Sequence, residues 1–335
     1  MNSSTSPFWH TRALVLGASG FIGYWVSRAL RAQGAHLTCA VRTVADAERL
    51  TSEHLGSVVV RRDLSDLELL SSWIPALRPA IVFNLAGYGV DRAERDEAEA
   101  DRMNHRFTAA LGRVVSTLPH DQWQGLRLVH VGSALEYGTT GGELTEGSEC
   151  APTTVYGRSK LAGTLALQAI ARDTGLDACI ARCFTVFGPG EHPGRLLPTL
   201  LGAAADGTAV PLSDGLQRRD FTYVEDVAEG LLRLAVSDAA PGEIVHLASG
   251  EMHTVRAFAE VAASLIHLPH VRLHFGAIPV RPEEMRHDGV SVTRLRTLTR
   301  WSPTGDLAEG VARTVGRLSE ANQRRSVATP PAVRT

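Results

Sequence analysis

The sequence predicts an α/β fold in which a doubly wound parallel sheet is accompanied by a smaller C-terminal lobe. Three features point to this fold. Short apolar segments alternate with helical patterns through the first half of the chain, and a glycine-rich turn follows the first segment. After about residue 186 this alternation ends, and proline, glycine and short strand patterns become frequent. Strands that alternate with helices pair in parallel, and helices then cover both faces of the sheet.

Apolar periodicity places the elements of the first half. Strands are expected at Ala13–Leu16, His36–Val41, Ser57–Arg61, Ile81–Leu85, Leu126–Val131 and Ala178–Thr185. Helices are expected at Phe21–Gln33, Leu67–Leu77, Glu97–Leu118 and Val155–Thr174. In the first of these helices, one face carries the apolar residues Ile22, Val26, Ala29 and Leu30.

The second half of the chain has a different character. Proline and glycine cluster in Phe187–Gly194, and short strands are then spread among helices such as Glu225–Val236 and Val255–Ile266. We therefore expect the sheet domain over residues 12–185 and a substrate-binding lobe over residues 186–321, interleaved with the last strands of the sheet. Residues 1–11 and 322–335 are expected to be tails with frayed ends.

Composition excludes several classes of protein. The 335 residues are 44% hydrophobic and 21% charged with a net charge of -2, which predicts a sizeable core and no nucleic-acid partner. The four cysteines form no C-x-x-C pair and no spacing typical of metal ligands, so we expect reduced thiols and no metal. No apolar run approaches the ~20 residues of a membrane span. The first residues also lack the apolar stretch of a secretory signal, so we expect a cytoplasmic protein.

The segment Gly17-Ala18-Ser19-Gly20-Phe21-Ile22-Gly23 lies between the first expected strand and the first expected helix. In this G-x-x-G-x-x-G pattern, Gly17 permits a tight turn, Gly20 allows close approach of a pyrophosphate, and Gly23 allows the helix to pack on the strand. The N–H groups of the helix N-terminus favour the phosphates. A simple packing turn is the alternative. We predict a dinucleotide site made by Gly17, Ser19, Gly20, Phe21, Ile22 and Gly23.

The end of the second strand indicates which dinucleotide binds. Val41 stands where NAD-binding sites usually place an acidic residue for the ribose 2′-hydroxyl, and Arg42 can bind a 2′-phosphate. An exposed arginine at a strand end is the alternative. We expect NADP(H), with NAD as the other possibility. Asp63 and Leu64 are expected near the adenine, although Asp63 or Ser65 could instead cap a helix.

A pair of side chains at the start of another helix suggests catalysis. Tyr156 and Lys160 are four residues apart and share one helical face, where an ammonium group favours the phenolate form of tyrosine. Ser133 ends the preceding strand, at the sheet edge where ligands bind. A surface helix and a serine that merely ends a strand are the alternatives. We predict a catalytic group of Ser133, Tyr156 and Lys160, in which Lys160 also holds the cofactor ribose.

With these motifs in place, residues 12–316 resemble the extended short-chain dehydrogenase/reductases, the NAD-dependent epimerase/dehydratase family that acts on nucleotide sugars. Further segments carry the resemblance: Asn84-Leu85-Ala86-Gly87, Asn104, Ser133–Gly138, Arg182–Gly190, Arg219–Ala228 and Trp301-Ser302-Pro303. The resemblance implies a seven-stranded Rossmann domain, a substrate lobe and often a homodimer formed through a helix bundle.

The resemblance also implies roles for individual residues. Leu85, Ala86, Gly87 and Asn104 would join the cofactor site, although Asn84-Leu85-Ala86-Gly87 departs from the usual His-Leu-Ala-Ala. Arg219 would bind a nucleotide diphosphate, with Arg281 as a second such arginine and Arg195 as a further candidate. Thr185 stands where many members have asparagine.

Absent residues narrow the reaction that the resemblance implies. Family 4,6-dehydratases carry Asp and Glu directly after the catalytic Ser or Thr, whereas this chain has Ala134 and Leu135, which would only line the substrate site. Glu136 comes one residue later and would point to the other side of an extended strand. We therefore expect an NADPH-dependent 4-ketoreductase of a nucleoside-diphosphate 4-keto-6-deoxyhexose. An NAD-dependent nucleotide-sugar 4-epimerase is the enzymatic alternative, and a non-catalytic NADP-binding regulatory or scaffold protein is the alternative of another class.

Overall fold

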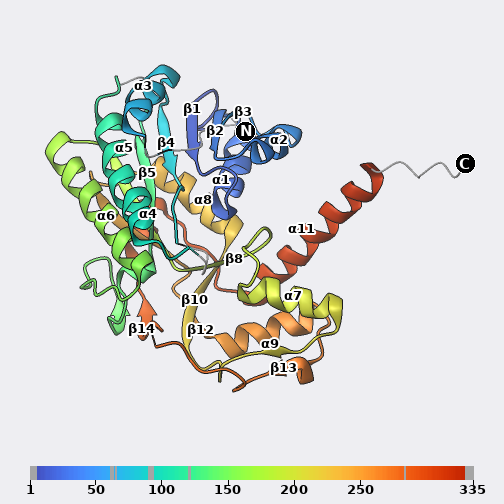
Figure 1. The fold of residues 1–335 in the computed structure, drawn as a ribbon. Helices are drawn as coiled ribbons and strands as arrows, with labels where there is room; N and C mark the ends of the chain where they lie inside the picture. Colours follow the sequence, from blue (N-terminus) through green and yellow to red (C-terminus); the bar gives the residue numbers. More distant parts are fainter. Residues whose placement is uncertain are drawn as a thin grey trace, which may run out of the picture.

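A computed structural model of the chain describes residues 6–60, 64, 66–89, 94–119, 122–282 and 284–328. Its main feature is a seven-stranded sheet in the order β11-β7-β5-β4-β1-β2-β3, with every neighbouring pair parallel (Figure 1). The strands are β1 Arg12–Leu16, β2 His36–Val41, β3 Ser57–Val60, β4 Ile81–Asn84, β5 Leu128–Ser133, β7 Ala178–Cys183 and β11 Glu243–Leu247. This arrangement confirms the predicted fold class.

Helices cover both faces of the sheet (Figure 1). The helices are α1 Phe21–Ala32 and α8 Val224–Ala235 on one face, and α3 Leu67–Leu77, α5 Phe107–Ser116 and α6 Val155–Thr174 on the other. Successive residues of β1 supply both sides, because Ala13 and Val15 belong to the first apolar core while Leu14 and Leu16 belong to the second. Burial on both faces explains why the strands read as continuous apolar runs.

Two helical segments differ from expectation. The stretch expected as one helix at Glu97–Leu118 is divided into α4 Glu97–Ala100, a π-helical turn at Asp101–Arg106 and α5. An additional helix, α2 Val44–Ser52, buries only Leu50, so its apolar periodicity is too weak to reveal it from the sequence.

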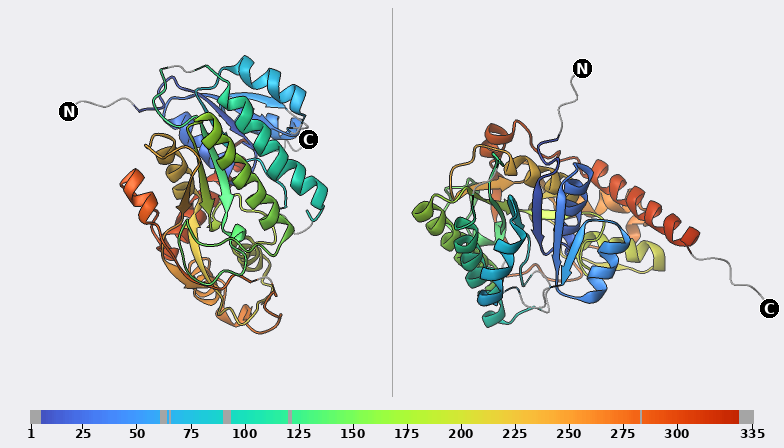
Figure 2. Two further views of the ribbon diagram at one scale, coloured as in Figure 1. Left: turned by 90° about the vertical axis from the view of Figure 1, so that its left-hand side faces the viewer. Right: turned by 90° about the horizontal axis from the view of Figure 1, so that it is seen from above.

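A smaller lobe lies beyond the carboxyl ends of the strands (Figures 1 and 2). It contains the small sheets β12-β10-β8, β13-β9 and β14-β6. Their strands are β6 Gly142–Leu144, β8 Thr185–Phe187, β9 Val210–Pro211, β10 Arg218–Tyr223, β12 Met252–Thr254, β13 Leu273–His274 and β14 His287–Val290. Its helices are α7 Leu196–Asp206, α9 Val255–Leu265 and α11 Leu307–Ala328, with a 3₁₀ turn at His270–Arg272. Helix α10 Thr293–Thr299 packs against α8 and β11 of the larger domain, and a 3₁₀ turn at Ala134–Glu136 follows β5.

The two parts exchange segments along the chain. Although they follow residue 186, α8 and β11 belong to the seven-stranded domain. Strand β6, which precedes residue 186, pairs instead with β14. Helix α11 leads away from the body of the molecule and continues to Ala328, so part of the stretch 322–335 is helical rather than frayed (Figure 1). Within the described ranges, no helix has the length and apolar content to cross a bilayer.

Candidate active site

A cavity of about 430 Å³ lies at the carboxyl edge of the main sheet, between the sheet and the smaller lobe. Parallel α/β sheets bind their ligands at this edge. Most of the predicted site residues line it: Gly20, Phe21, Ile22, Gly23, Arg42, Leu85, Ala86, Gly87, Ser133, Ala134, Leu135, Tyr156, Lys160, Thr185, Arg195 and Arg219. Segments far apart in the sequence therefore meet around one space.

The glycine turn has the geometry of a phosphate-binding loop. Gly17 has φ +77°, and a Cβ there would lie 2.9 Å from the backbone N of Ala86. A Cβ on Gly23 would lie 2.1 Å from the carbonyl oxygen of Gly17, so only glycine lets the helix start this close to the strand. Gly17 and Ser19 belong to this turn without lining the cavity.

Helix α1 begins at the cavity with its N-terminus open. Gly20 is the N-cap residue, no described side chain caps the helix, and the first turn carries no acidic residue. The first N–H groups of a helix have no intrahelical partner, and the helix dipole favours an anion there. These residues fit the pyrophosphate of a dinucleotide.

The end of β2 differs from that of an NAD-type site. Val41 is buried and Arg42 is exposed at the cavity. A second arginine, Arg49 of α2, donates a 2.7 Å hydrogen bond from Nη2 to the carbonyl oxygen of Ser19. Asp63 lies outside the described residues, and Leu64 is buried in the apolar core away from the cavity lining.

Ser133 and Tyr156 are brought together by two element ends. Ser133 is the last residue of β5, and Tyr156 lies in the first turn of α6, where Thr154 caps the helix by accepting a hydrogen bond from the N–H of Gly157. The two side chains face the same cavity and are close enough for the Ser133 hydroxyl to act on the pKa of Tyr156. Burial and the charge of Glu136 raise the pKa of Tyr156, whereas the Ser133 hydroxyl lowers it less. The phenol is therefore neutral at physiological pH.

Lys160 lies one helical turn beyond Tyr156 and is only 4% exposed. Its Nζ donates a 2.6 Å hydrogen bond to the carbonyl oxygen of Val131. Burial lowers the pKa of Lys160 to about 8, although Glu136 and Cys183 act in the opposite direction. Lys and Arg together number 34, and Lys160 is the only lysine in the chain. A chain that otherwise uses only arginine for fixed positive charge thus retains one amine that can titrate, inside the cavity.

Glu136 lies elsewhere than expected. The chain after Ser133 forms a 3₁₀ turn rather than an extended strand, and the Glu136 side chain folds back beneath it. One carboxylate oxygen accepts a 2.7 Å hydrogen bond from the N–H of Ser133, and the other accepts one of 2.8 Å from Nε of Arg182. Glu136 is fully buried and does not line the cavity. Its hydrogen bonds support Ser133 and the 3₁₀ turn that follows it, which we call the serine turn.

Asn104 also lies outside the cavity lining. Its side chain accepts a hydrogen bond from the N–H of Tyr88 and donates to the carbonyl oxygen of Tyr88 and to Oγ of Ser159. Through these bonds Asn104 ties the loop after β4, which includes Gly87, to helix α6. A direct contact of Asn104 with the cofactor remains a prediction.

Positive charge gathers on the lobe side of the cavity. Burial lowers the pKa of Arg219, and Arg195 lowers it further by charge repulsion, while Glu284 forms an ion pair with Arg219. Arg281 lies elsewhere: it lines a second cavity of about 340 Å³, which shares Met285 and His287 with the first. In the main cavity, the partner of Arg219 is therefore Arg195 rather than Arg281.

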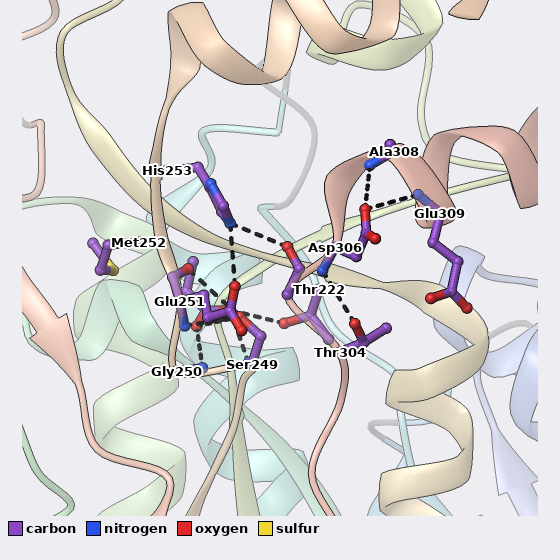
Figure 3. Close-up of polar contacts among 12 residues, drawn as sticks. Thr222, Ser249, Gly250, Glu251, Met252, His253, Thr304, Asp306, Ala308 and Glu309 are labelled. Carbon is purple, nitrogen blue, oxygen red and sulfur yellow. Dashed lines mark hydrogen bonds and ion pairs between the residues drawn. The ribbon is translucent and has the colours of Figure 1, made fainter.

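A buried carboxylate next to Arg219 fixes the strand that carries it. Asp220 accepts hydrogen bonds from Oγ1 of Thr222, from the N–H and Oγ of Ser249, and from the N–H of Gly250. Figure 3 labels the three residues that donate these bonds. Burial raises the pKa of Asp220, and these four hydrogen bonds act against that rise. The network joins β10 to the loop after β11 and sets the position of Arg219.

Several ionisable residues that line the cavity were not identified as site residues from the sequence, among them Glu191 and His287. Burial raises the pKa of Glu191 to about 7, and its ion pair with Arg195 opposes this rise. His287 comes from β14, and burial lowers its pKa to about 4. Neither residue belongs to a local motif that could have identified it. Among the described residues, no group of three or more His, Cys, Asp or Glu side chains could hold a metal ion.

A dinucleotide-binding turn and a Ser–Tyr–Lys group on one cavity define the class of protein: an NAD(P)-dependent oxidoreductase-type enzyme that uses a nicotinamide cofactor. Residues 13–253, more than half of the chain, match the model of the NAD dependent epimerase/dehydratase family. The chain belongs to this family.

Known proteins of similar sequence and structure agree with this assignment. The chain is 28% identical over 325 residues to a dTDP-glucose 4,6-dehydratase of Xanthomonas campestris pv. campestris, covering 90% of this chain and 91% of that protein. The dTDP-glucose 4,6-dehydratase DesIV of Streptomyces venezuelae, solved with bound NAD, has a TM-score of 0.80 at 25% identity, covering 94% and 98% of the two chains. A UDP-glucuronic acid 4-epimerase of Bacillus cereus shares the fold with a TM-score of 0.79 at 21% identity, covering 92% and 99%.

Proposed function

We propose that the protein uses NADPH to reduce the 4-keto group of a nucleoside-diphosphate 4-keto-6-deoxyhexose. One observation carries this proposal. The cavity holds Ser133, Tyr156 and Lys160 together, whereas Ala134 and Leu135, which follow the serine, provide no group that can transfer a proton. Such a site can support hydride transfer at a carbon that bears oxygen, and the two positions after the serine lack the acid and base that would remove water.

The residues have defined tasks in this reaction. The reduced nicotinamide supplies a hydride for the carbonyl carbon. Tyr156, neutral because of its burial, donates its proton to the carbonyl oxygen, and Ser133 donates a hydrogen bond to the same oxygen. The Lys160 ammonium stabilises the phenolate left on Tyr156, which is then reprotonated from solvent.

The substrate class is supported by charge and by relatives. Arg195 and Arg219 offer two guanidinium groups to a diphosphate on the lobe side of the cavity. Arg219, which forms an ion pair with Glu284, would exchange that carboxylate for the phosphate oxygens. Relatives that match along nine-tenths of the chain are named dTDP-glucose 4,6-dehydratases.

The choice of NADPH rests on the end of β2. The structures of relatives were solved with NAD, but here Val41 offers no carboxylate to the ribose 2′-hydroxyl, and Arg42 can neutralise a 2′-phosphate. A homodimer formed through a helix bundle remains a prediction.

The proposal is tested with purified protein and dTDP-4-keto-6-deoxyglucose, followed by the absorbance of NADPH. We expect NADPH consumption by the wild type and a loss of at least ~10³-fold in the Tyr156→Phe variant, because the proton donor is gone. The UDP-linked ketosugar is assayed in parallel to identify the nucleotide base that the enzyme prefers.

A 4-epimerase would give a different result. It would carry tightly bound NAD after purification and interconvert two sugars without net consumption of cofactor. Stoichiometric NAD in the purified protein, with no NADPH consumption on any 4-ketosugar, would exclude the reductase. A Tyr156→Phe protein with its full biological effect would point to a non-catalytic role.

A further inference from the structure

Lys160 lies at the end of a buried polar chain that the proposed reaction does not use. Asn84 of β4 and His130 of β5 occupy paired positions on neighbouring strands. The Nδ1 atom of His130 lies 3.0 Å from Nδ2 of Asn84, and its Nε2 atom lies 3.5 Å from Nζ of Lys160. Asn84 and His130 are fully buried and do not line the cavity.

The protonation of this chain can be derived from its chemistry. Burial, followed by the charge of Lys160, holds the pKa of His130 well below its usual value, so the ring is neutral and carries one N–H. The ammonium of Lys160 can only donate, so Nε2 must be the acceptor and the proton must be on Nδ1. The Nδ1–H group then needs an acceptor, which has to come from Asn84.

The amide of Asn84 supplies that acceptor after a half-turn. Its Oδ1 is buried and has no hydrogen-bond partner among the described residues. Rotation of the amide brings Oδ1 to the Nδ1–H group of His130, at the distance now occupied by Nδ2. Asn84 thus selects the tautomer that turns a lone pair of His130 towards Lys160.

We propose that His130, oriented by Asn84, is a positioning residue that holds the Lys160 side chain in place and keeps it charged. Together with the carbonyl oxygen of Val131, it gives the buried ammonium two acceptors. The other ionisable groups that act on Lys160 are Glu136 and Cys183. This inference rests on the proposed role of Lys160 beside Tyr156.

The charge of Lys160 can be measured directly, because the chain has no other lysine. Protein labelled with ¹³C at lysine Cε gives one side-chain resonance, and its shift with pH reports the pKa of Lys160 without any substrate. We compare the wild type with His130→Leu, which removes the acceptor, and with His130→Gln, whose amide oxygen can accept in place of Nε2.

We expect Lys160 to titrate near pH 8 in the wild type. In His130→Leu the midpoint should fall by about one pH unit, since a hydrogen bond to a charged group is lost. His130→Gln should stay close to the wild type, and the alkaline limb of NADPH-dependent reduction should follow the same order. An unchanged Lys160 midpoint in His130→Leu would overturn the proposal, and this result would stand whether or not the enzyme reduces ketosugars.

A second measurement does not depend on whether the His130→Leu variant folds. In the ¹⁵N-histidine spectrum of the wild type, the signal of His130 is identified by its disappearance in His130→Gln. We expect the tautomer protonated at Nδ1 over the whole neutral pH range. A proton on Nε2, or a charged ring at pH 7, would contradict the arrangement.

Discussion

Glu136 and Arg182 form an ion pair of 2.8 Å in the interior of the protein, where neither side chain is more than 2% exposed. Arg182 on β7 is paired in register with Gly132 on β5, immediately before Ser133. Because the second oxygen of Glu136 accepts from the N–H of Ser133, this pair links the core of the sheet to the serine turn.

Removing the charge of Glu136 should therefore destabilise the protein and disturb the site. In Glu136→Gln, Arg182 keeps a buried charge without its counterion, which costs about 3 kcal/mol of unfolding free energy. The measurement is urea unfolding, with kcat determined on the folded fraction. The matched control is Glu97→Gln, which breaks the exposed ion pair with Arg158 and should cost less than ~1 kcal/mol. Equal stability of the two variants would show that the buried pair is not structural.

The buried amine of Lys160 should lower stability in a pH-dependent manner. Its ordinary pKa of 10.5 falls to about 8 in the folded protein, so between these values the unfolded chain binds the extra proton. Stability therefore increases with pH through this window, and the full cost of roughly 3 kcal/mol applies below pH 8.

Lys160→Met should consequently be inactive and more stable. We expect the free energy of unfolding to increase by about 2 kcal/mol at pH 7, since the lost hydrogen bond to Val131 offsets part of the stabilisation that comes from removing the buried charge. Urea unfolding at neutral and alkaline pH measures it, and the advantage should disappear above the ordinary lysine pKa. A gain independent of pH would mean that packing, not charge, is responsible.

Local spacing explains what could be predicted from the sequence. The turn from Gly17 to Gly23 and the pair Tyr156–Lys160 each depend on residues a few positions apart in one element, so their geometry follows from the element itself. The alternation of apolar strand segments with helical patterns was likewise sufficient to predict the parallel sheet, because strands that are apolar on both faces must be covered by helices on both sides.

Contacts between distant segments could not be predicted. His130 meets Asn84, and Arg182 meets Glu136, only because neighbouring strands pair in a particular register. His130 meets Lys160 because helix α6 packs against β5. Arg281 was placed by resemblance alone, and the path of the chain before β14 takes it to the adjoining cavity. Glu191 enters the main cavity from an irregular loop, where neither helical nor strand periodicity indicates a direction.

Arg42 should set the preference between the two dinucleotides. Arg42→Ala should weaken NADP binding by about 10- to 100-fold, since a charge-assisted contact to the 2′-phosphate is lost, while NAD binding should change little. Titration calorimetry with both cofactors measures the ratio. Arg49→Ala tests the neighbouring guanidinium beside Ser19, and the exposed Arg113→Ala on α5 is the control. Equal losses for NADP and NAD in Arg42→Ala would contradict the assignment.

A methyl group at Gly23 should abolish cofactor binding. The added Cβ would lie 2.1 Å from the carbonyl oxygen of Gly17 and 3.1 Å from Cα of Ala18, both backbone atoms, so helix α1 must move away from the turn. That movement shifts the N–H groups that are predicted to bind the pyrophosphate, and we expect at least a ~100-fold loss of dinucleotide affinity.

Gly202→Ala provides the contrast, because Gly202 lies inside helix α7 with no atom within 4 Å of the added Cβ. Alanine there should raise the unfolding free energy by about 0.5–1 kcal/mol and leave dinucleotide binding unchanged. Calorimetric titration of both variants with NADP separates the loss of a close backbone approach from the general effect of replacing a helical glycine. If Gly23→Ala bound NADP as well as Gly202→Ala does, the turn could not be the phosphate site, and the cofactor would have to enter the cavity in another orientation.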